Sequence, residues 1–272
     1  MLTSDMFKVD GFGVVVTGAA SGLGLAFTEV LSEHGGHVAM FDIDAGRLAR
    51  EGARLRDLGR EVRETPVDIT DRVALDRAFD ETVESFGRLD VVFANAGIDP
   101  GVGVLAADGG RTVDGAFENY ADQRWDRVIE ANLNSIFCTI RAAARHMKPR
   151  RSGRIIVTTS VASVRATPIA AAYSAAKAGA AHLMRNAALE LARYNILVNA
   201  IAPGPFVTNI GGGHVHDPAV QERMARAIPL HRVGDPEEMK GLALFLASPA
   251  SSFMTGAEIF NDGGMSIGPP ID

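Results

Sequence analysis

Cysteine is almost absent from this sequence, with Cys138 the only one in 272 residues. A single cysteine excludes an intramolecular disulfide and a cluster of thiolate ligands for a metal. Another group of potential metal ligands is His214, His216 and Asp217. Glycines precede this group, and we interpret it as part of a solvated loop rather than as a metal site. The sequence therefore predicts neither a disulfide nor a metal ion.

Long hydrophobic runs and net positive charge are missing as well. No stretch of about 18 residues is apolar and free of charge, as a membrane-spanning helix requires. Residues 1–10 lack the apolar segment of a signal peptide. The net charge is −6 and the pI is near 5.7, which argues against a general affinity for nucleic acids or anionic membranes. We expect a cytoplasmic protein with neither kind of partner.

The sequence does contain enough apolar side chains, 47% of all residues, for a substantial core. Short β-branched runs alternate with longer amphipathic segments, which is the pattern of a parallel sheet with helices on both faces. We expect strands at residues 13–17, 37–42, 61–67, 89–94, 154–159, 197–202 and 258–261. We expect helices at residues 22–34, 45–58, 72–86, 123–146, 173–194 and 236–247. The pattern predicts an α/β fold: a single-domain, Rossmann-like, doubly wound parallel sheet of seven strands.

Two irregular segments interrupt this alternation. Residues 98–122 are rich in Gly and Asp, and residues 209–232 contain three consecutive glycines followed by a short helical stretch at about 218–227. Long irregular segments in a compact domain are usually binding loops or lids. We therefore expect one NAD-binding catalytic domain over residues 1–272, in which these two segments are insertions that bind the substrate.

A glycine-rich turn links the first predicted strand to the first predicted helix. It reads Thr-Gly-Ala-Ala-Ser-Gly-Leu-Gly over residues 17–24. Such a turn lets the backbone approach a pyrophosphate, whose charge is met by the amides and the dipole of the helix N-terminus. The candidate contacts with a dinucleotide in this turn are Gly18, Ser21, Gly22, Leu23 and Gly24.

An aspartate, Asp42, ends the second predicted strand, where the ribose of an adenine dinucleotide would lie. A carboxylate there accepts hydrogen bonds from both ribose hydroxyls and repels a 2′-phosphate, so NAD is favoured over NADP. Arg47 is near enough to leave NADP as an alternative, and Asp42 could instead cap the following helix. Asp68, with Ile69 beside it, ends the third strand and could bind the adenine amino group or cap the next helix. We include both residues among the cofactor contacts.

A tyrosine and a lysine, Tyr173 and Lys177, stand four residues apart and therefore share one face of a predicted helix. A phenol with an ordinary pKa of about 10 is a poor acid or base at neutral pH, and a neighbouring cation favours the phenolate and lowers that pKa. The chain has only three tyrosines and four lysines, so the pair is improbable by chance. Taken alone, the two side chains could still do no more than lie along a helix surface.

Together with Ser160, thirteen residues before Tyr173, these motifs resemble the short-chain dehydrogenase/reductase family, in the form with Thr-Gly-x-x-x-Gly-x-Gly and Tyr-x-x-x-Lys. Residues 94–97 are similar to the family's Asn-Asn-Ala-Gly, although Ala94 replaces the first asparagine, and residues 199–204 and 261–264 resemble two later family segments. The resemblance implies four catalytic residues: Asn132, Ser160, Tyr173 and Lys177. It also implies cofactor contacts from Asn95, Ala96, Gly97, Tyr173, Lys177, Pro203, Gly204, Phe206, Val207 and Thr208.

The resemblance further implies reversible hydride transfer between NAD and a small secondary alcohol or ketone. Tyr173 would exchange the substrate proton and Ser160 would donate a hydrogen bond to the substrate oxygen. Lys177 would lower the pKa of the tyrosine and bind the nicotinamide ribose, and Asn132 would carry a proton relay through an interrupted helix. Family members are commonly tetramers, so a homotetramer is expected. An NADP-dependent ketone reductase of the same family and a non-catalytic nucleotide-sensing protein are the alternatives.

Overall fold

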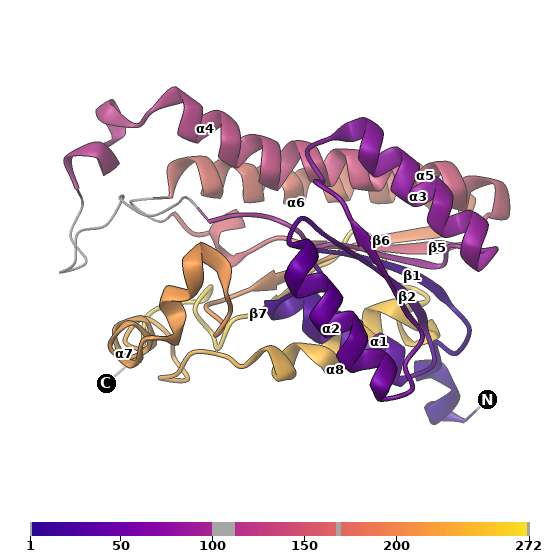
Figure 1. The fold of residues 1–272 in the computed structure, drawn as a ribbon. Coiled ribbons are helices and arrows are strands. Elements are labelled where there is room, and N and C mark those ends of the chain that lie inside the picture. The colour runs from indigo at the N-terminus through magenta and orange to yellow at the C-terminus, as the bar shows by residue number, and fades with distance from the viewer. Residues whose placement is uncertain (1, 100–111, 167–169, 271–272) are drawn as a thin grey trace.

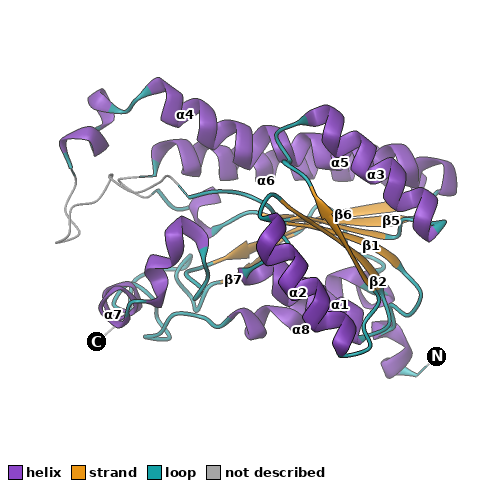
Figure 2. Cartoon of the chain, viewed as in Figure 1, coloured by secondary structure: helices purple, strands orange, loops and turns teal. Residues whose placement is uncertain are grey.

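The centre of the fold is one seven-stranded parallel sheet (Figures 1 and 2), in the order β3-β2-β1-β4-β5-β6-β7. The computed structural model describes residues 2–99, 112–166 and 170–270. The strands are β1 Gly13–Thr17, β2 His37–Asp42, β3 Val62–Pro66, β4 Val91–Ala94, β5 Gly153–Thr158, β6 Ile196–Pro203 and β7 Glu258–Asn261. All seven predicted strands are present, and the predicted parallel sheet is confirmed.

Helices cover both faces of the sheet (Figure 1). One face carries α1 Gly22–Glu33, α2 Ala45–Asp57 and α8 Lys240–Ala247, and the other carries α3 Arg72–Phe86, α4 Asp122–Ile129, α5 Ser135–Arg150 and α6 Ala171–Leu191. Alternate residues of a strand point to opposite faces. Val15 is accordingly buried in one apolar cluster with residues of α3, α5 and α6, whereas Val14 and Val16 are buried in a second cluster with residues of α1 and α8. The fold therefore has an apolar core on each side of the sheet.

The helix predicted over residues 123–146 is not a regular α-helix throughout. A π-helical turn, Glu130–Asn134, joins α4 to α5, and α5 continues to Arg150. The helix predicted over residues 236–247 likewise begins with a 3₁₀ turn, Pro236–Met239, before α8. Asp235 and Glu238 form a capping box on that turn. Both departures lie at helix segments that border the site described below.

The two irregular segments contain short helical elements. Within residues 98–122 the structure has 3₁₀ turns at Val113–Gly115 and Phe117–Asn119, whereas residues 100–111 lie outside the described part of the chain. Residues 209–232 contain a 3₁₀ segment, Ile210–His216, and α7 Pro218–Ala225. The described parts of both segments lie at the same end of the molecule, on the left in Figure 1. Among the described helices, none is long and apolar enough to cross a membrane.

Candidate active site

The candidate site lies at the carboxyl ends of the central strands. The strand order changes direction between β1 and β4, because β1 pairs with β2 on one side and with β4 on the other. Loops leaving the two strands diverge at such a switch point and leave a crevice that binds ligands in open α/β sheets. The predicted site residues follow β1, β2, β4, β5 and β6 in the chain, so the parallel sheet brings their segments to one edge.

The glycine-rich turn after β1 has a backbone that other residues would strain. Gly18 and Gly22 have φ of +69° and +54°, in the left-handed region. A Cβ on Gly24 would lie 2.0 Å from the carbonyl oxygen of Gly18 and 2.7 Å from the side-chain Nδ2 of Asn95. The glycines therefore allow a close turn whose backbone faces the start of α1. The side chain of Ser21, the N-cap residue, makes no capping hydrogen bond to that helix.

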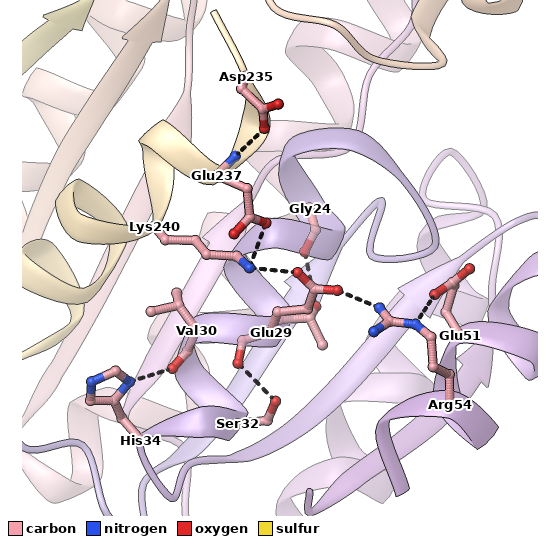
Figure 3. Close-up of polar contacts among 11 residues, drawn as sticks. Gly24, Glu29, Val30, Ser32, His34, Glu51, Arg54, Asp235, Glu237 and Lys240 are labelled. Carbon is pink, nitrogen blue, oxygen red and sulfur yellow. Dashed lines mark hydrogen bonds and ion pairs between the residues drawn. The ribbon is translucent and has the colours of Figure 1, made fainter. Parts of the chain in front are cut away.

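The helix that follows the turn is fixed by a cluster of ion pairs (Figure 3). Glu29 of α1 pairs with Lys240 of α8, at 2.7 Å, and with Arg54 of α2. Burial tends to raise the pKa of Glu29, but the hydrogen bonds from Lys240 and Arg54 outweigh it and the pKa is lowered. Arg54 also pairs with Glu51, and Lys240 also pairs with Glu237. The cluster thus ties α1, and the turn at its N-terminus, to both neighbouring helices.

The carboxylate of Asp42 joins β2 to the glycine-rich turn. Its Oδ2 accepts a hydrogen bond from the backbone N–H of Ala20, and its Oδ1 accepts one from the N–H of Asp44, both at 2.9 Å. The cap of α2 is Asp44, whose side chain accepts from the N–H of Arg47. The alternative that Asp42 caps this helix is therefore wrong. Each oxygen of Asp42 has a second lone pair that a ribose hydroxyl could use.

The segment after β3 shows whether Asp68 caps the following helix. The Oδ1 of Asp68 accepts hydrogen bonds from both the N–H and the hydroxyl of Thr70. Asp71 is the residue that caps α3, by accepting from the N–H groups of Val73 and Ala74. Asp68 therefore shapes a local turn at the sheet edge rather than capping the helix. Its neighbour Ile69 packs against the apolar core.

The side chain of Asn95 links three strands. Its Nδ2 donates to the carbonyl oxygen of Thr17 at 3.0 Å, and its Oδ1 accepts from the hydroxyl of Thr158 at 3.0 Å. The hydroxyl oxygen of Thr17 in turn accepts from the N–H groups of Asn95 and Ala96. The amide of Asn95 thus positions the ends of β1, β4 and β5. Thr17, the first residue of the glycine-rich motif, and Thr158 thus belong to the framework of the site. Sequence reasoning missed Thr158, because only its place at a strand end marks it.

The helix asparagine, Asn132, lies in the π-helical turn and is fully buried. Its Nδ2 donates to the carbonyl oxygens of Val128, at 3.0 Å, and Ile98, at 2.9 Å, while its Oδ1 accepts from the N–H of Ile98 at 3.2 Å. The expected interruption of the helix by this side chain is confirmed. A Cβ on Gly97 would lie 2.5 Å from Oδ1 of Asn132 and 3.7 Å from Nζ of Lys177, so only glycine fits between them.

Ser160, Tyr173 and Lys177 converge beside this turn. The Ser160 hydroxyl accepts from the N–H of Ala162 at 3.2 Å, and its interaction with the phenol acts to lower the pKa of Tyr173. The ammonium of Lys177 lies 5.6 Å from the centre of the Tyr173 ring and donates to the carbonyl oxygen of Thr158 at 2.9 Å. Lys177 is 3% exposed. The structure therefore brings together a hydroxyl, a phenol and a buried cation from β5 and α6.

Burial is the largest influence on the pKa values of Tyr173 and Lys177. Burial raises the pKa of Tyr173 to about 12, the hydrogen bond with Ser160 opposes that rise, and the negative charge of Asp99 adds to it. Burial also lowers the pKa of Lys177 to about 8. Loss of hydration is the largest cause of the rise in the pKa of Tyr173. That Lys177, together with the charge of an oxidised nicotinamide, lowers this pKa stays a prediction. At neutral pH the phenol is protonated.

The segment after β6 borders the glycine-rich turn. A Cβ on Gly22 would lie 3.1 Å from the Cβ of Thr208, and a cavity of about 260 Å³ lined by Gly22, Val207 and Thr208 opens there. Pro203 ends β6 and Gly204 packs on Asp262. The glycine-rich turn and the segment after β6 therefore face one another across this cavity.

Phe206, a predicted cofactor contact, is largely buried. Its side chain is 7% exposed and belongs to the apolar core, where its ring packs against the backbone of Gly234. Among the described residues no group of three or more His, Cys, Asp or Glu could hold a metal ion, and His216 contacts Asn209 at 3.2 Å instead.

Comparisons with known proteins agree with this geometry. Residues 18–266 match the family model described as enoyl-(acyl carrier protein) reductase. The chain is 39% identical over 251 residues to cis-4-hydroxycyclohexanecarboxylate dehydrogenase of Sinomonas cyclohexanicum, covering 92% of this chain and 94% of that protein.

Two solved structures share the fold. A gluconate 5-dehydrogenase from Burkholderia cenocepacia J2315, in complex with NADP and tartrate, has a TM-score of 0.86 and 32% identity over 97% of this chain and 98% of its own. A 7α-hydroxysteroid dehydrogenase complexed with NADH and 7-oxo glycochenodeoxycholic acid has a TM-score of 0.85 and 30% identity over 97% and 98%. The chain therefore belongs to the short-chain dehydrogenase/reductase family, as an oxidoreductase that acts on alcohol or keto groups with a nicotinamide cofactor.

Proposed function

We propose that this protein is an NAD-dependent oxidoreductase that interconverts a secondary alcohol and its ketone, with Tyr173 as the acid and base. The observation that carries the proposal is the buried ammonium of Lys177, which lies 5.6 Å from the centre of the Tyr173 ring, with the Ser160 hydroxyl interacting with the same phenol. A proton donor and a hydroxyl that meet at one point are suited to a single substrate oxygen. Asn132, within the adjoining π-helical turn, holds the backbone next to Lys177 in place.

Each residue has a definite task in this mechanism. In reduction, Tyr173 donates its phenolic proton to the ketone oxygen while Ser160 donates a hydrogen bond to the same oxygen, where negative charge develops. In oxidation, the tyrosinate accepts the alcohol proton. Lys177 keeps a positive charge near the phenol at neutral pH, since its pKa is about 8. The nicotinamide ring, when bound, accepts or supplies the hydride.

The high pKa of Tyr173 gives the two directions opposite pH dependences. The protonated phenol, which dominates below a pKa of about 12, is the form that reduction needs. Oxidation needs the phenolate, so its rate should increase as the pH rises. The site can run both ways, and the ratio of the two rates is set by pH and by the charge that the cofactor brings.

The choice of NAD rests on the end of β2. The Asp42 carboxylate lies against the glycine-rich turn, where it is placed to accept from ribose hydroxyls and to repel a 2′-phosphate. Ile43, the next residue, is 71% exposed and offers no positive charge. Arg47, the nearest basic residue in the sequence, lies 3.7 Å from Asp44, so its charge is partly neutralised. NADP remains the alternative cofactor, since one of the related structures contains it.

The wider assembly is also part of the proposal. Residues 98–122 and 209–232 would form the substrate-binding surface, since their described parts flank the same end of the sheet. The relatives named above act on a ring alcohol, a sugar acid and a steroid, so a small-molecule secondary alcohol is the common chemistry. We propose a homotetramer built through the helices that carry Asn132 and Tyr173, and a cytoplasmic location.

A panel of secondary alcohols, screened for reduction of NAD and of NADP, tests this function. We expect turnover with NAD that falls ~10²-fold or more in Tyr173→Phe, while NADH binding, measured by nicotinamide fluorescence, stays nearly unchanged. The matched control is Tyr194→Phe, because Tyr194 lies among Lys148, Arg151 and Arg193 at the far end of α6. Turnover that survives in Tyr173→Phe would refute the assignment, and NADH binding without turnover of any alcohol or ketone would favour the nucleotide-sensing alternative.

A further inference from the structure

A carboxylate far from Ser160 in the sequence lies close behind it in the structure. Glu258, the first residue of β7, has a side chain only 3% exposed. Its Oε1 accepts hydrogen bonds from the hydroxyls of Thr159, at 2.9 Å, and Ser163, at 2.7 Å, and its Oε2 pairs with Arg185 at 2.7 Å. Thr159 and Ser163 stand on either side of Ser160 in the chain.

These bonds hold the turn that carries the Ser160 hydroxyl. The 3₁₀ turn Val161–Ser163 follows Ser160, whose carbonyl oxygen accepts from the N–H of Ser163 at 2.9 Å. An ionised carboxylate only accepts hydrogen bonds, so the hydroxyl of Ser163 donates to Glu258. The hydroxyl of Thr159 lies between two acceptors, Glu258 at 2.9 Å and the carbonyl oxygen of Ile201 at 3.1 Å. The position of Ser160 is thereby fixed from the residue before it and from the end of the turn after it.

The same carboxylate reaches the helix of the acid and base. Arg185 belongs to α6, which also carries Tyr173 and Lys177. Its ion pair with Glu258 therefore links the serine turn to that helix, although Glu258 stands 73 to 99 positions after its three partners in the chain. The side chain of Arg185 is 46% exposed, and an ion pair with an exposed partner contributes little to stability because solvent screens it. The place of this ion pair behind Ser160 points to another purpose.

We propose that Glu258 is a positioning residue, a clamp that keeps the Ser160 hydroxyl directed toward Tyr173 by binding Thr159, Ser163 and Arg185. It touches neither substrate nor cofactor and acts through Ser160. This inference rests on the proposed function, since it assumes that the Ser160 hydroxyl acts on the substrate oxygen. It extends that function by naming the group that sets the geometry of the serine relative to the tyrosine.

Kinetics of single and double variants test the clamp. Glu258→Leu should lower kcat about tenfold, a part of the ~10²-fold that a preorganised donor contributes, with little change in the KM for NAD. Glu258→Gln keeps an acceptor oxygen for both hydroxyls and should restore kcat to within about threefold. In a Ser160→Ala background Glu258→Leu should have no further effect, because the two residues act through one step. An equal loss in both backgrounds, or no loss in either, would overturn the proposal.

Two further variants keep the test decisive. Ser163→Ala removes one of the two clamping hydroxyls at a partly exposed residue, and it should lower kcat severalfold except in the Ser160→Ala background; it serves if Glu258→Leu does not fold. The matched control is Glu190→Leu on α6, whose carboxylate is 67% exposed and pairs only with Lys148 among the ion pairs of the described residues. It should leave kcat unchanged, and a loss equal to that of Glu258→Leu would contradict a specific clamp.

A titration without any substrate separates this inference from the proposed function. With a fluorinated tyrosine at position 173, whose lower intrinsic pKa brings the titration into a pH range where the protein is folded, Ser160→Ala should raise the pKa of that residue. Glu258→Leu should raise it in the same direction, and the double variant should match Ser160→Ala alone. A protein that turns over no alcohol but shows this pattern would refute the function and support the clamp. An unchanged pKa in Glu258→Leu would refute the clamp whatever the enzyme's activity.

Discussion

Replacing Asp42 should change the choice between NAD and NADP, and the structure gives the size of the effect. A carboxylate that accepts from a ribose hydroxyl contributes ~1.5–3 kcal/mol per hydrogen bond. Loss of one such bond in Asp42→Ala should weaken NADH binding ~10- to 100-fold. The repulsion between this carboxylate and a 2′-phosphate costs between ~1 and ~4 kcal/mol at about 4 Å. Its removal should therefore improve NADPH binding while NADH binding deteriorates.

The backbone contacts of Asp42 separate a cofactor effect from a loss of stability. The N–H of Ala20 donates to Asp42, and Ala20 is 1% exposed. In Asp42→Ala this N–H loses its acceptor, which should lower the free energy of unfolding by ~1–3 kcal/mol. Asp42→Asn keeps an acceptor oxygen but loses the charge, so it should retain more stability while still shifting preference toward NADPH.

Fluorescence titration with NADH and with NADPH, beside thermal unfolding of each variant, measures both effects without a substrate. We expect the ratio of the two dissociation constants to shift at least tenfold toward NADPH in Asp42→Asn. Asp44→Asn is the matched control, because Asp44 caps α2 and asparagine is an equally good cap. A native protein that binds NADPH as tightly as NADH, or a ratio that Asp42→Asn leaves unchanged, would refute the reasoning.

Two more predictions concern Lys177 and Gly24. The pKa of Lys177 is lowered by burial from 10.5 to about 8, so the folded protein releases this proton before the unfolded chain does. Its unfavourable burial is fully present below pH 8, and the free energy of unfolding should rise between pH 8 and 10.5 by up to about 3 kcal/mol. Lys177→Met should abolish turnover and also this rise, which denaturant unfolding at several pH values measures. A rise that persists in the variant would contradict the lowered pKa of Lys177. Gly24→Ala places a Cβ 2.0 Å from a carbonyl oxygen and should cost ~1–3 kcal/mol and at least tenfold in NADH affinity, whereas Gly241→Ala, with nothing within 4 Å of the new Cβ, should leave both unchanged or slightly improved.

Much of the fold could be predicted because its signals are local. Most of the strands are short apolar runs and the helices between them are longer and amphipathic, so periodicity places them in order; β3, Val62–Pro66, is the polar exception. The first residues of the helices were less predictable, since neighbouring aspartates could each cap the same helix. Asp42 and Asp44 could both cap α2, and only the structure shows that Asp44 does so while Asp42 bonds to the glycine-rich turn. Asp68 and Asp71 present the same ambiguity before α3, where Asp71 is the cap.

The site was predictable where one segment determines the geometry. Tyr173 and Lys177 share a helix face because of their spacing, and Gly18 and Gly22 need a turn with positive φ. The pKa of Tyr173 could not be predicted in this way, because it depends on burial, which is a property of the whole fold. Glu258 escaped notice for a similar reason, since its partners stand 73 to 99 residues away and no local motif connects them.

The glycine-rich turn and the proton-transfer group are joined by one chain of hydrogen bonds, although neither touches the other. Thr17, at the start of the glycine-rich turn, bonds to Asn95 on the next strand, and Asn95 bonds to Thr158 on the strand beyond. The carbonyl oxygen of Thr158 then accepts from the ammonium of Lys177. Parallel strands in fixed register hold their ends at fixed separations. This series of hydrogen bonds therefore sets the distance between the glycine-rich turn and Lys177. A change at Asn95 should therefore disturb both ends of the site at once, even though its side chain is occupied entirely by the protein's own strands.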